Sequence, residues 1–155
     1  MIEDGFADEA ALLTMLERQA DAWKTGDFTL ASKDWHPDGV LTAPGNRVPF
    51  AALAETIRRF HADFVDLEVT ITNAFASADG KKLAFEWLWT VSRRRDGARS
   101  ATPDAIIVDL ADGKILEWRE YFDTAAAVED YHAKDDASGR AEVDTEDSAS
   151  RGTAP

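Results

Sequence analysis

Residues 112–123 of the chain read DGKILEWREYFD. The Asp-Gly pair favours a tight turn, and the residues after it alternate in the manner of a strand. Successive side chains on a strand point to opposite faces, so one face is predicted to hold the carboxylate of Glu120 among Leu116, Trp118 and Phe122. The opposite face holds Ile115, Glu117, Arg119 and Tyr121. An acid among apolar groups is either paired or has a raised pKa, because such surroundings disfavour its charged form. The segment therefore predicts a strand that carries an acid–base group on its inner face.

The same segment resembles part of a known family. The turn, the I-x-x-W-R-E-Y-F-D ending and the helix expected after it resemble the last strand of the SnoaL-like branch of the nuclear transport factor 2-like superfamily. That superfamily includes SnoaL-type polyketide cyclases, ketosteroid isomerases and limonene epoxide hydrolases. With the order of elements included, the resemblance covers about residues 8–132, although only the last strand is specific. It implies an α+β fold, in which a cone-shaped, curved antiparallel sheet has three N-terminal helices packed on its concave face.

The pattern along the chain agrees with this fold class, because helical spacing comes first and strand alternation follows. Helices are predicted at about residues 8–25, 27–33 and 49–64. Strands are predicted at about residues 40–43, 66–75, 82–93, 102–110 and 114–122. A last short helix, capped by Asp123, is expected to run to about Tyr131.

The composition of the whole chain limits the classes of partner. Its 155 residues, 45% of them hydrophobic, fit a single domain, predicted at residues 1–133 and followed by a disordered acidic tail at residues 134–155. The formal net charge of −13 repels phosphate backbones and anionic lipids, so neither nucleic acid nor a membrane is an expected partner. Cysteine is absent, and acids stand where a signal peptide needs basic and apolar residues, which predicts a cytoplasmic protein.

Strand alternation also predicts which side chains face the pocket that the family resemblance implies. If Glu120 points inward, the neighbouring strand turns Asp104 inward with Ile106, and the strand before it turns Trp87 and Trp89 inward. We predict Glu120 and Asp104 as the catalytic residues. The predicted substrate-binding residues are Gln19, Trp23, Trp87, Trp89, Trp118 and His61.

Each of these residues also has a simpler interpretation. A row of aromatic side chains on a strand is often packing only, and Glu120 could form a structural salt bridge with Arg18 or Arg59. Asp104 could meet solvent at the end of its strand, and His61 could lie on a helix surface. The sequence leaves these alternatives open.

Comparison with two branches of the superfamily restricts the chemistry. In limonene epoxide hydrolases the matching acid works with an arginine and an aspartate, where Trp87 and Trp89 stand here, and a tyrosine and an asparagine are missing from residues 40–43. Ketosteroid isomerases carry a base where Ala43 stands and a tyrosine where Gln19 stands. The sequence therefore argues against both epoxide hydrolysis and ketosteroid isomerisation. SnoaL-type cyclases need one carboxylate as acid and base, and Glu120 is compatible with that chemistry.

The histidines show no metal-binding spacing such as His-x-x-x-His, and there is no phosphate loop or dinucleotide fingerprint. We therefore predict neither a metal nor a cofactor. The predicted function is proton transfer by an isomerase, cyclase or lyase, with Glu120 as general acid and base and with Asp104 or Gln19 polarising a carbonyl of a small apolar cyclic molecule. The alternative is a non-catalytic ligand-binding or dimeric assembly domain. The family resemblance also predicts a homodimer through the outer sheet face, which would cover Leu88, Ile107 and Tyr121.

Overall fold

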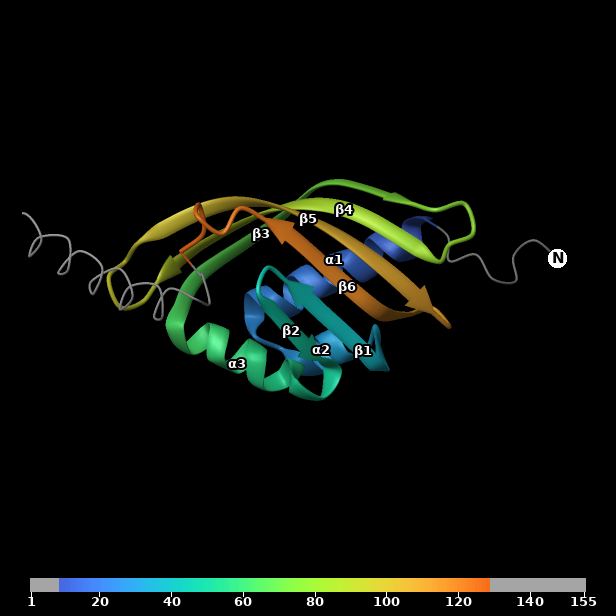
Figure 1. Ribbon diagram of the computed structural model, residues 1–155, viewed down its shortest axis with the longest axis horizontal. Helices are drawn as coiled ribbons and strands as arrows, with labels where there is room; N and C mark the ends of the chain where they lie inside the picture. The colour runs from blue at the N-terminus through green and yellow to red at the C-terminus, as the bar shows by residue number, and fades with distance from the viewer. Residues whose placement is uncertain (1–8, 129–155) are drawn as a thin grey trace, which may run out of the picture.

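A computed structural model describes residues 9–128 of the chain. Two helices come first, a pair of strands stands between them and the third helix, and four long strands follow, as Figure 1 shows. The helical elements are α1 (Glu9–Thr25), α2 (Phe28–Ser32), the short 3-10 helix η1 (Phe50–Ala52) and α3 (Leu53–Asp63). The strands are β1 (Trp35–Ala43), β2 (Asn46–Pro49), β3 (Phe64–Ala76), β4 (Lys82–Arg93), β5 (Arg99–Ala111) and β6 (Lys114–Phe122). The predicted α+β class is confirmed.

Buried apolar residues at helical spacing form α1, and a glycine and a capping aspartate separate it from α2. Leu12, Leu16, Ala20 and Trp23 recur at intervals of three or four residues and are all buried. Gly26, with φ +72°, ends α1 in a left-handed conformation that glycine adopts without steric cost. Asp27 then caps α2 by accepting a hydrogen bond from the backbone N–H of Leu30 at 3.1 Å.

The sheet is mixed, with the strand order β2-β1-β6-β5-β4-β3. β1 runs parallel to β6, whereas the other neighbouring strands are antiparallel. The prediction of an antiparallel sheet is therefore wrong for one pair. β1 follows α2, and no tight turn joins β1 to β6. The chain passes through the meander β3 to β5 before it reaches β6, and such a long connection allows the two strands to run parallel.

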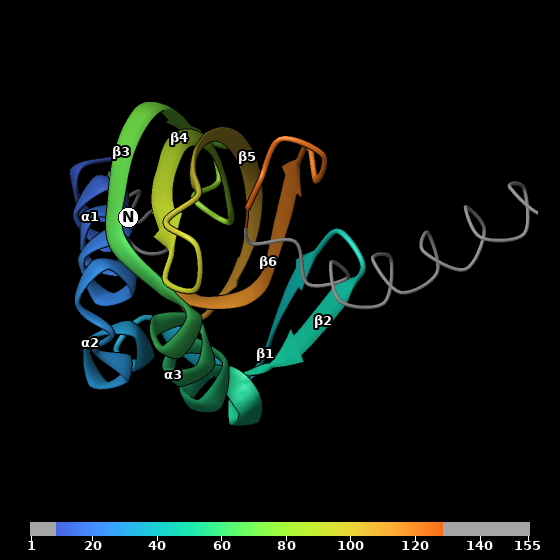
Figure 2. The ribbon, with the colours of Figure 1, turned by 90° about the vertical axis from the view of Figure 1, so that its left-hand side faces the viewer.

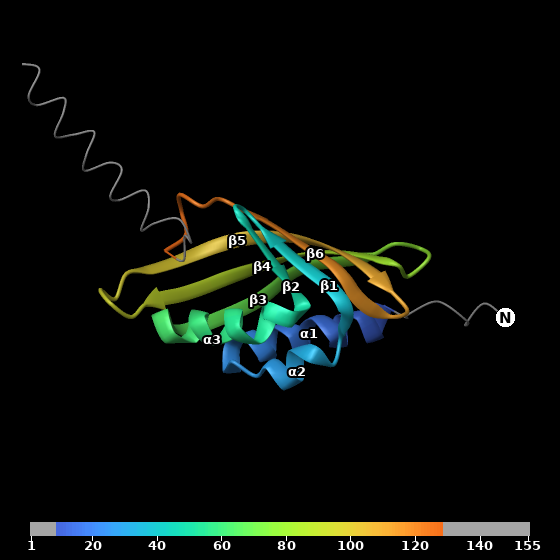
Figure 3. The ribbon, with the colours of Figure 1, turned by 60° about the horizontal axis from the view of Figure 1, so that its bottom comes forward.

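The helices cover one face of a curved, open sheet. Figures 2 and 3 show the sheet bending around α1, α2 and α3, which lie on the same side of it. The inner face carries the predicted rows of β4 and β5, in which Phe85, Trp87, Ile106 and Val108 are at most 2% exposed. This alternation was correctly predicted. In the described residues, 9–128, no helix is long and apolar enough to cross a membrane.

Three local predictions need correction. β1 begins at Trp35 and not at residue 40, because an irregularity in its pairing with β6 lets the chain pass the Pro37 and Gly39 positions and remain in the sheet. β2 was not predicted from the sequence; it pairs with β1 across the Gly45 turn. After β6, residues 123–128 form turns and no helix, and the remainder of the predicted last helix and the tail lie outside the described residues.

Candidate functional site

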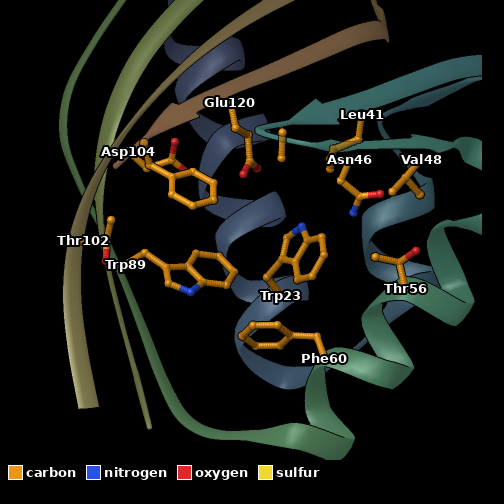
Figure 4. A pocket seen from close by; sticks show the side chains of 12 residues that line it. Trp23, Leu41, Asn46, Val48, Thr56, Phe60, Trp89, Thr102, Asp104 and Glu120 are labelled. Carbon is orange, nitrogen blue, oxygen red and sulfur yellow. The ribbon is translucent and has the colours of Figure 1, made fainter. Parts of the chain in front are cut away.

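A pocket lies between the helices and the inner face of the sheet (Figure 4). Its cavity volume is about 40 Å³ for a water-sized sphere, which is room for a few water molecules. In this conformation a larger ligand would have to move side chains. The lining residues are Trp23, Leu41, Ala43, Asn46, Val48, Thr56, Phe60, Trp89, Thr102, Asp104, Glu120 and Phe122.

The two predicted catalytic acids both line this pocket. β5 and β6 pair Asp104 with Phe122 and Ile106 with Glu120, so the two acids are diagonal neighbours on one face of adjacent strands. Such neighbours have Cβ atoms roughly 7 Å apart. Figure 4 shows both carboxylates directed into the same space. The strand register thus brings together two acids that are 16 positions apart in the sequence, taking residue 120 minus residue 104.

Each acid is oriented by a buried indole. Trp87 Nε1 donates to Asp104 Oδ2 at 3.0 Å, and Trp118 Nε1 donates to Glu120 Oε1 at 2.7 Å. Trp87 and Trp118 are each 1% exposed and lie beside the acids on the same face of the sheet, but neither lines the pocket. The structure therefore gives these two predicted substrate-binding residues contacts that hold the acids in place.

The aromatic part of the lining comes from three different elements. Trp23 of α1 packs edge-on against Phe60 of α3, with ring centroids 5.9 Å apart, and against Trp89 of β4, at 5.8 Å. Phe60 and Trp89 are also edge-on, at 5.4 Å. Trp23 and Trp89 are the predicted aromatic residues that line the pocket, and Phe60 joins them.

Gln19 lies away from the pocket, in a buried polar network. Its Nε2 donates to the carbonyl oxygen of Ala31 and to Asp34 Oδ2, both at 2.9 Å, and its Oε1 accepts from Trp35 Nε1 at 3.1 Å. Arg18 binds the same carboxylate through Nε at 2.8 Å and Nη2 at 2.7 Å. That hydrogen bond raises the pKa of Arg18 above its usual value, against the opposing effect of burial.

His61 is also placed outside the pocket lining. Its Nε2 lies 2.6 Å from the carbonyl oxygen of Trp23, close to the C-terminal end of α1, and its ring packs edge-on against Phe60. A Cβ added to Gly26 would approach the imidazole to 3.2 Å. His61 thus packs α3 against the end of α1, behind two residues that line the pocket.

The two arginines considered as salt-bridge partners of Glu120 are engaged elsewhere. Arg18 pairs with Asp34, and Arg59 Nε lies 3.1 Å from Glu55 Oε1. The hydrogen bond from Arg58 is the largest cause of a lowered Glu55 pKa, about 2, and Arg59 adds to it.

Sequence reasoning missed three polar residues of the lining: Asn46, Thr56 and Thr102. Thr102 could have been found, because it lies two residues before Asp104 and therefore on the same face of β5. Asn46 begins the unpredicted strand β2, and Thr56 lies on the inner side of α3. Asn46 has no local pattern that marks it as pocket-lining, whereas Thr56 could have been found, because it lies at helical spacing between the buried Leu53 and Phe60.

Two buried polar atoms in this lining have no hydrogen-bond partner among the described residues, Thr102 Oγ1 and Trp89 Nε1. Thr102 is 1% exposed. Buried polar groups in native proteins nearly always have partners, so these two atoms are exceptions within the pocket lining. Within residues 9–128 there is no group of three His, Cys, Asp or Glu side chains that could hold a metal ion.

The sequence profile of the SnoaL-like domain matches residues 16–118, well over half of the chain. The chain belongs to the SnoaL-like domain family. The match ends at Trp118, so Glu120 lies two residues beyond it. None of the curated proteins matches the chain.

Solved structures of low sequence identity share the fold. A protein from Catenulispora acidiphila with a ketosteroid isomerase-like fold, determined in complex with trimethylamine, has a TM-score of 0.66 at 16% identity over 72% of this chain and 87% of its own. A Pseudomonas putida KT2440 protein provisionally named a polyketide cyclase has a TM-score of 0.66 at 18% identity over 75% and 94%. A LEH-like epoxide hydrolase from M. tuberculosis has a TM-score of 0.61 at 23% identity over 73% of this chain and 83% of its own. At these identities the likeness concerns the fold alone.

Proposed function

We propose that this SnoaL-like protein binds a small, largely apolar cyclic molecule and catalyses proton transfer on it, as an isomerase, cyclase or lyase does. The observation that carries the proposal is the pair of carboxylates, Asp104 and Glu120, directed into one aromatic pocket from adjacent strands. A positioned carboxylate can remove a proton from carbon and return it elsewhere. The hydrogen bonds from Trp87 and Trp118 support the proposal, because they hold the acids in defined orientations.

In this proposal Glu120 is the general acid and base. It takes the proton from a carbon next to a carbonyl, and the electron pair of the broken C–H bond moves into the developing enolate. Asp104, in its protonated form, donates a hydrogen bond to the carbonyl oxygen and stabilises the charge that develops there. The proton on Glu120 then returns to another atom of the substrate.

Exchange of carbon-bound hydrogen tests this without knowledge of the natural substrate. Small cyclic ketones such as cyclohexanone and 2-cyclohexenone are incubated with the protein in D₂O, and loss of the α-proton signals is followed by NMR. We expect exchange faster than in buffer, and we expect Glu120→Gln to remove most of the acceleration, because the amide cannot accept the proton.

Glu117→Gln is the matched control, since Glu117 lies on the same strand with its side chain 54% exposed. It should exchange the ketones like the wild type. If Glu120→Gln retains the full rate, the proton acceptor is not Glu120. If no ketone exchanges although ketones shift the NMR signals of Trp23, the site binds without catalysing proton transfer.

A non-catalytic assembly domain is the second candidate, and the outer sheet face is the observation that favours it. Phe75 is 60% exposed, Tyr121 56% and Ile107 40%, and Leu88 is half-buried on the same face. Large apolar side chains gathered on one face suit a subunit interface. We propose that this face forms a homodimer. Sedimentation at micromolar concentration should then give about twice the chain mass of 17.0 kDa, and Ile107→Arg should reduce it; a wild-type monomer at high concentration would contradict the dimer.

A further inference from the structure

The pocket wall combines negative charge with aromatic ring faces. We propose that the group it selects is an organic ammonium, so that its ligand is a small, mainly apolar molecule that carries a protonated or quaternary amine. This inference rests on the proposed function in taking this pocket as the ligand site. A bound cation holds both acids ionised, whereas the proton transfer uses Asp104 in its protonated form, so the two ligands would bind different protonation states of Asp104. It adds the charge and chemical class of the ligand.

The carboxylates supply the first part of the argument. Asp104 is 6% exposed, and Glu120 is half-buried beside it on the next strand. Diagonal neighbours roughly 7 Å apart at Cβ can both approach one cation that lies between their carboxyl groups. In a pocket shielded from water, such a cation interacts more strongly with these acids than it would in bulk solvent.

The aromatic rings supply the second part. Trp23 is inclined by 70° to Trp89 and by 87° to Phe60, so these rings form differently oriented walls and not a parallel stack. Phe122 adds a fourth ring to the lining, next to Glu120 along β6. The negative face of an aromatic ring attracts an ammonium ion, with tryptophan the most favourable, and several inclined rings can surround it.

The remaining lining residues are compatible with a cation. No Lys, Arg or His is among the described residues that line the pocket, so nothing in that lining repels a positive charge. The buried Thr102 Oγ1, which has no hydrogen-bond partner among residues 9–128, can accept a hydrogen bond from an ammonium N–H. The formal net charge of −13 on the whole chain also favours the approach of cations over anions.

The five tryptophans allow a direct test, because their indole N–H groups give separate NMR signals. Tetramethylammonium is titrated into ¹⁵N-labelled protein at constant pH and ionic strength, with tert-butanol as a neutral ligand of similar size. We expect tetramethylammonium to shift the signals of Trp23 and Trp89, which line the pocket. Trp35, bound to Gln19 in the buried network, should not shift. We expect tert-butanol to bind about ten-fold more weakly, which corresponds to the cation–π energy of a partly desolvated site.

Isosteric variants identify the charges responsible. Glu120→Gln and Asp104→Asn should each weaken tetramethylammonium binding by about ten-fold, whereas Glu117→Gln, which removes the same charge from the outer face, should change it less than two-fold. An unshifted Trp35 signal in each variant shows that the fold is retained.

Three results would overturn the inference: no shift of Trp23 and Trp89 at a saturating cation concentration, equal affinity for tert-butanol, or equal affinity in Glu120→Gln, Asp104→Asn and Glu117→Gln. None of them decides the proposed proton transfer, which the exchange of ketone hydrogens tests independently. Conversely, selective cation binding without any exchange would retain the ligand class and remove the catalytic function.

Discussion

Two regions of this protein hold buried or half-buried carboxylates in opposite ways. In the network beneath α1, Asp34 is 5% exposed and accepts two hydrogen bonds from Arg18 and one from Gln19. In the pocket, Trp87 donates a hydrogen bond to Asp104 and Trp118 donates one to Glu120. A guanidinium supplies a charge-assisted, two-point contact, whereas an indole supplies one neutral donor.

The two regions also differ in which helices and strands their carboxylates connect. Arg18 and Gln19 belong to α1, Asp34 precedes β1, and the carbonyl of Asp34 accepts the N–H of Ile115 at the start of β6 at 2.7 Å. Asp34 therefore joins a helix to two strands. The pocket acids contact indoles of their own or the adjacent strand and face the cavity. In this protein, burial of an acid alone therefore does not indicate function. The hydrogen-bond donors around the acid and the open space in front of it do.

Neutralising Asp34 should have the largest effect on stability. Asp34→Asn removes the charge that Arg18 faces and turns an amide N–H₂ toward its donors. Removal of one partner of a buried ion pair costs on the order of 3 kcal/mol, here at the low end because the Arg18 side chain is 32% exposed and can turn to water. The unfolding midpoint should fall by roughly 10 °C in a thermal melt followed by circular dichroism.

Asp38→Asn is the matched control, since Asp38 lies four residues further along, on β1, with a side chain 85% exposed. It should change the free energy of unfolding by less than about 0.5 kcal/mol. Equal midpoints for the two variants would contradict the structural function assigned to Asp34.

Gln19→Leu tests whether Gln19 belongs to the network or to the ligand site. Leucine fills a similar volume but leaves Trp35 Nε1 and the Ala31 carbonyl without this buried partner, at a cost of about 2 kcal/mol. Glu17→Leu, on the exposed side of the same helix, serves as the control. Unchanged stability combined with weaker binding of tetramethylammonium would show that Gln19 acts in the ligand site and not in the Asp34 network.

Glu120→Gln should affect stability much less than Asp34→Asn does. The amide oxygen can still accept the hydrogen bond from Trp118 Nε1, and acids placed for chemistry often reduce the stability of the fold. We expect the free energy of unfolding, from urea titration, to stay within about 1 kcal/mol of the wild type or to rise. A loss as large as that of Asp34→Asn would assign Glu120 to a structural ion pair.

Thr102→Val should have the smallest effect on the free energy of unfolding, and the change should be opposite in sign to that of Asp34→Asn. It removes a buried hydroxyl that has no hydrogen-bond partner within the described chain, so stability should be unchanged or rise by up to about 1 kcal/mol. Thr56→Val is the control in the same pocket, because Thr56 Oγ1 donates to the Ala52 carbonyl at 2.9 Å and its loss should cost about 1 kcal/mol. A larger loss at Thr102 than at Thr56, by urea titration, would show that the Thr102 hydroxyl contributes to the fold.

Much of the sheet was predictable because its inner face is buried against helices. Period-two alternation correctly turned Trp87, Ile106 and Trp118 inward, and all three are 1% exposed. Alternation failed at Ile115, which was assigned to the outer face and is fully buried. Its strand pairing is irregular there, between Asp109 and Leu110, and Trp35 of β1 lies opposite it.

The polar groups of the candidate site were less predictable, because their positions depend on how the helices and strands pack and not on a local sequence pattern. Gln19 was predicted because it stands where ketosteroid isomerases carry a tyrosine, and His61 because it lies on a predicted helix. Helix packing instead directs His61 to the end of α1 and Gln19 to Asp34. Asn46 depends on a four-residue strand whose alternation is too short to detect.

The α+β class, the faces of the long strands and the inward direction of two acids follow from the order of the residues, because side-chain periodicity is a local consequence of strand geometry. Three features depend on how the elements pack: β1 runs parallel to β6, Arg18 neutralises Asp34, and Trp87 and Trp118 orient the pocket acids. These pairings depend on which elements the fold brings together. They depend on which donors the packed helices and strands bring within about 3 Å of each carboxylate, a distance that no local pattern specifies.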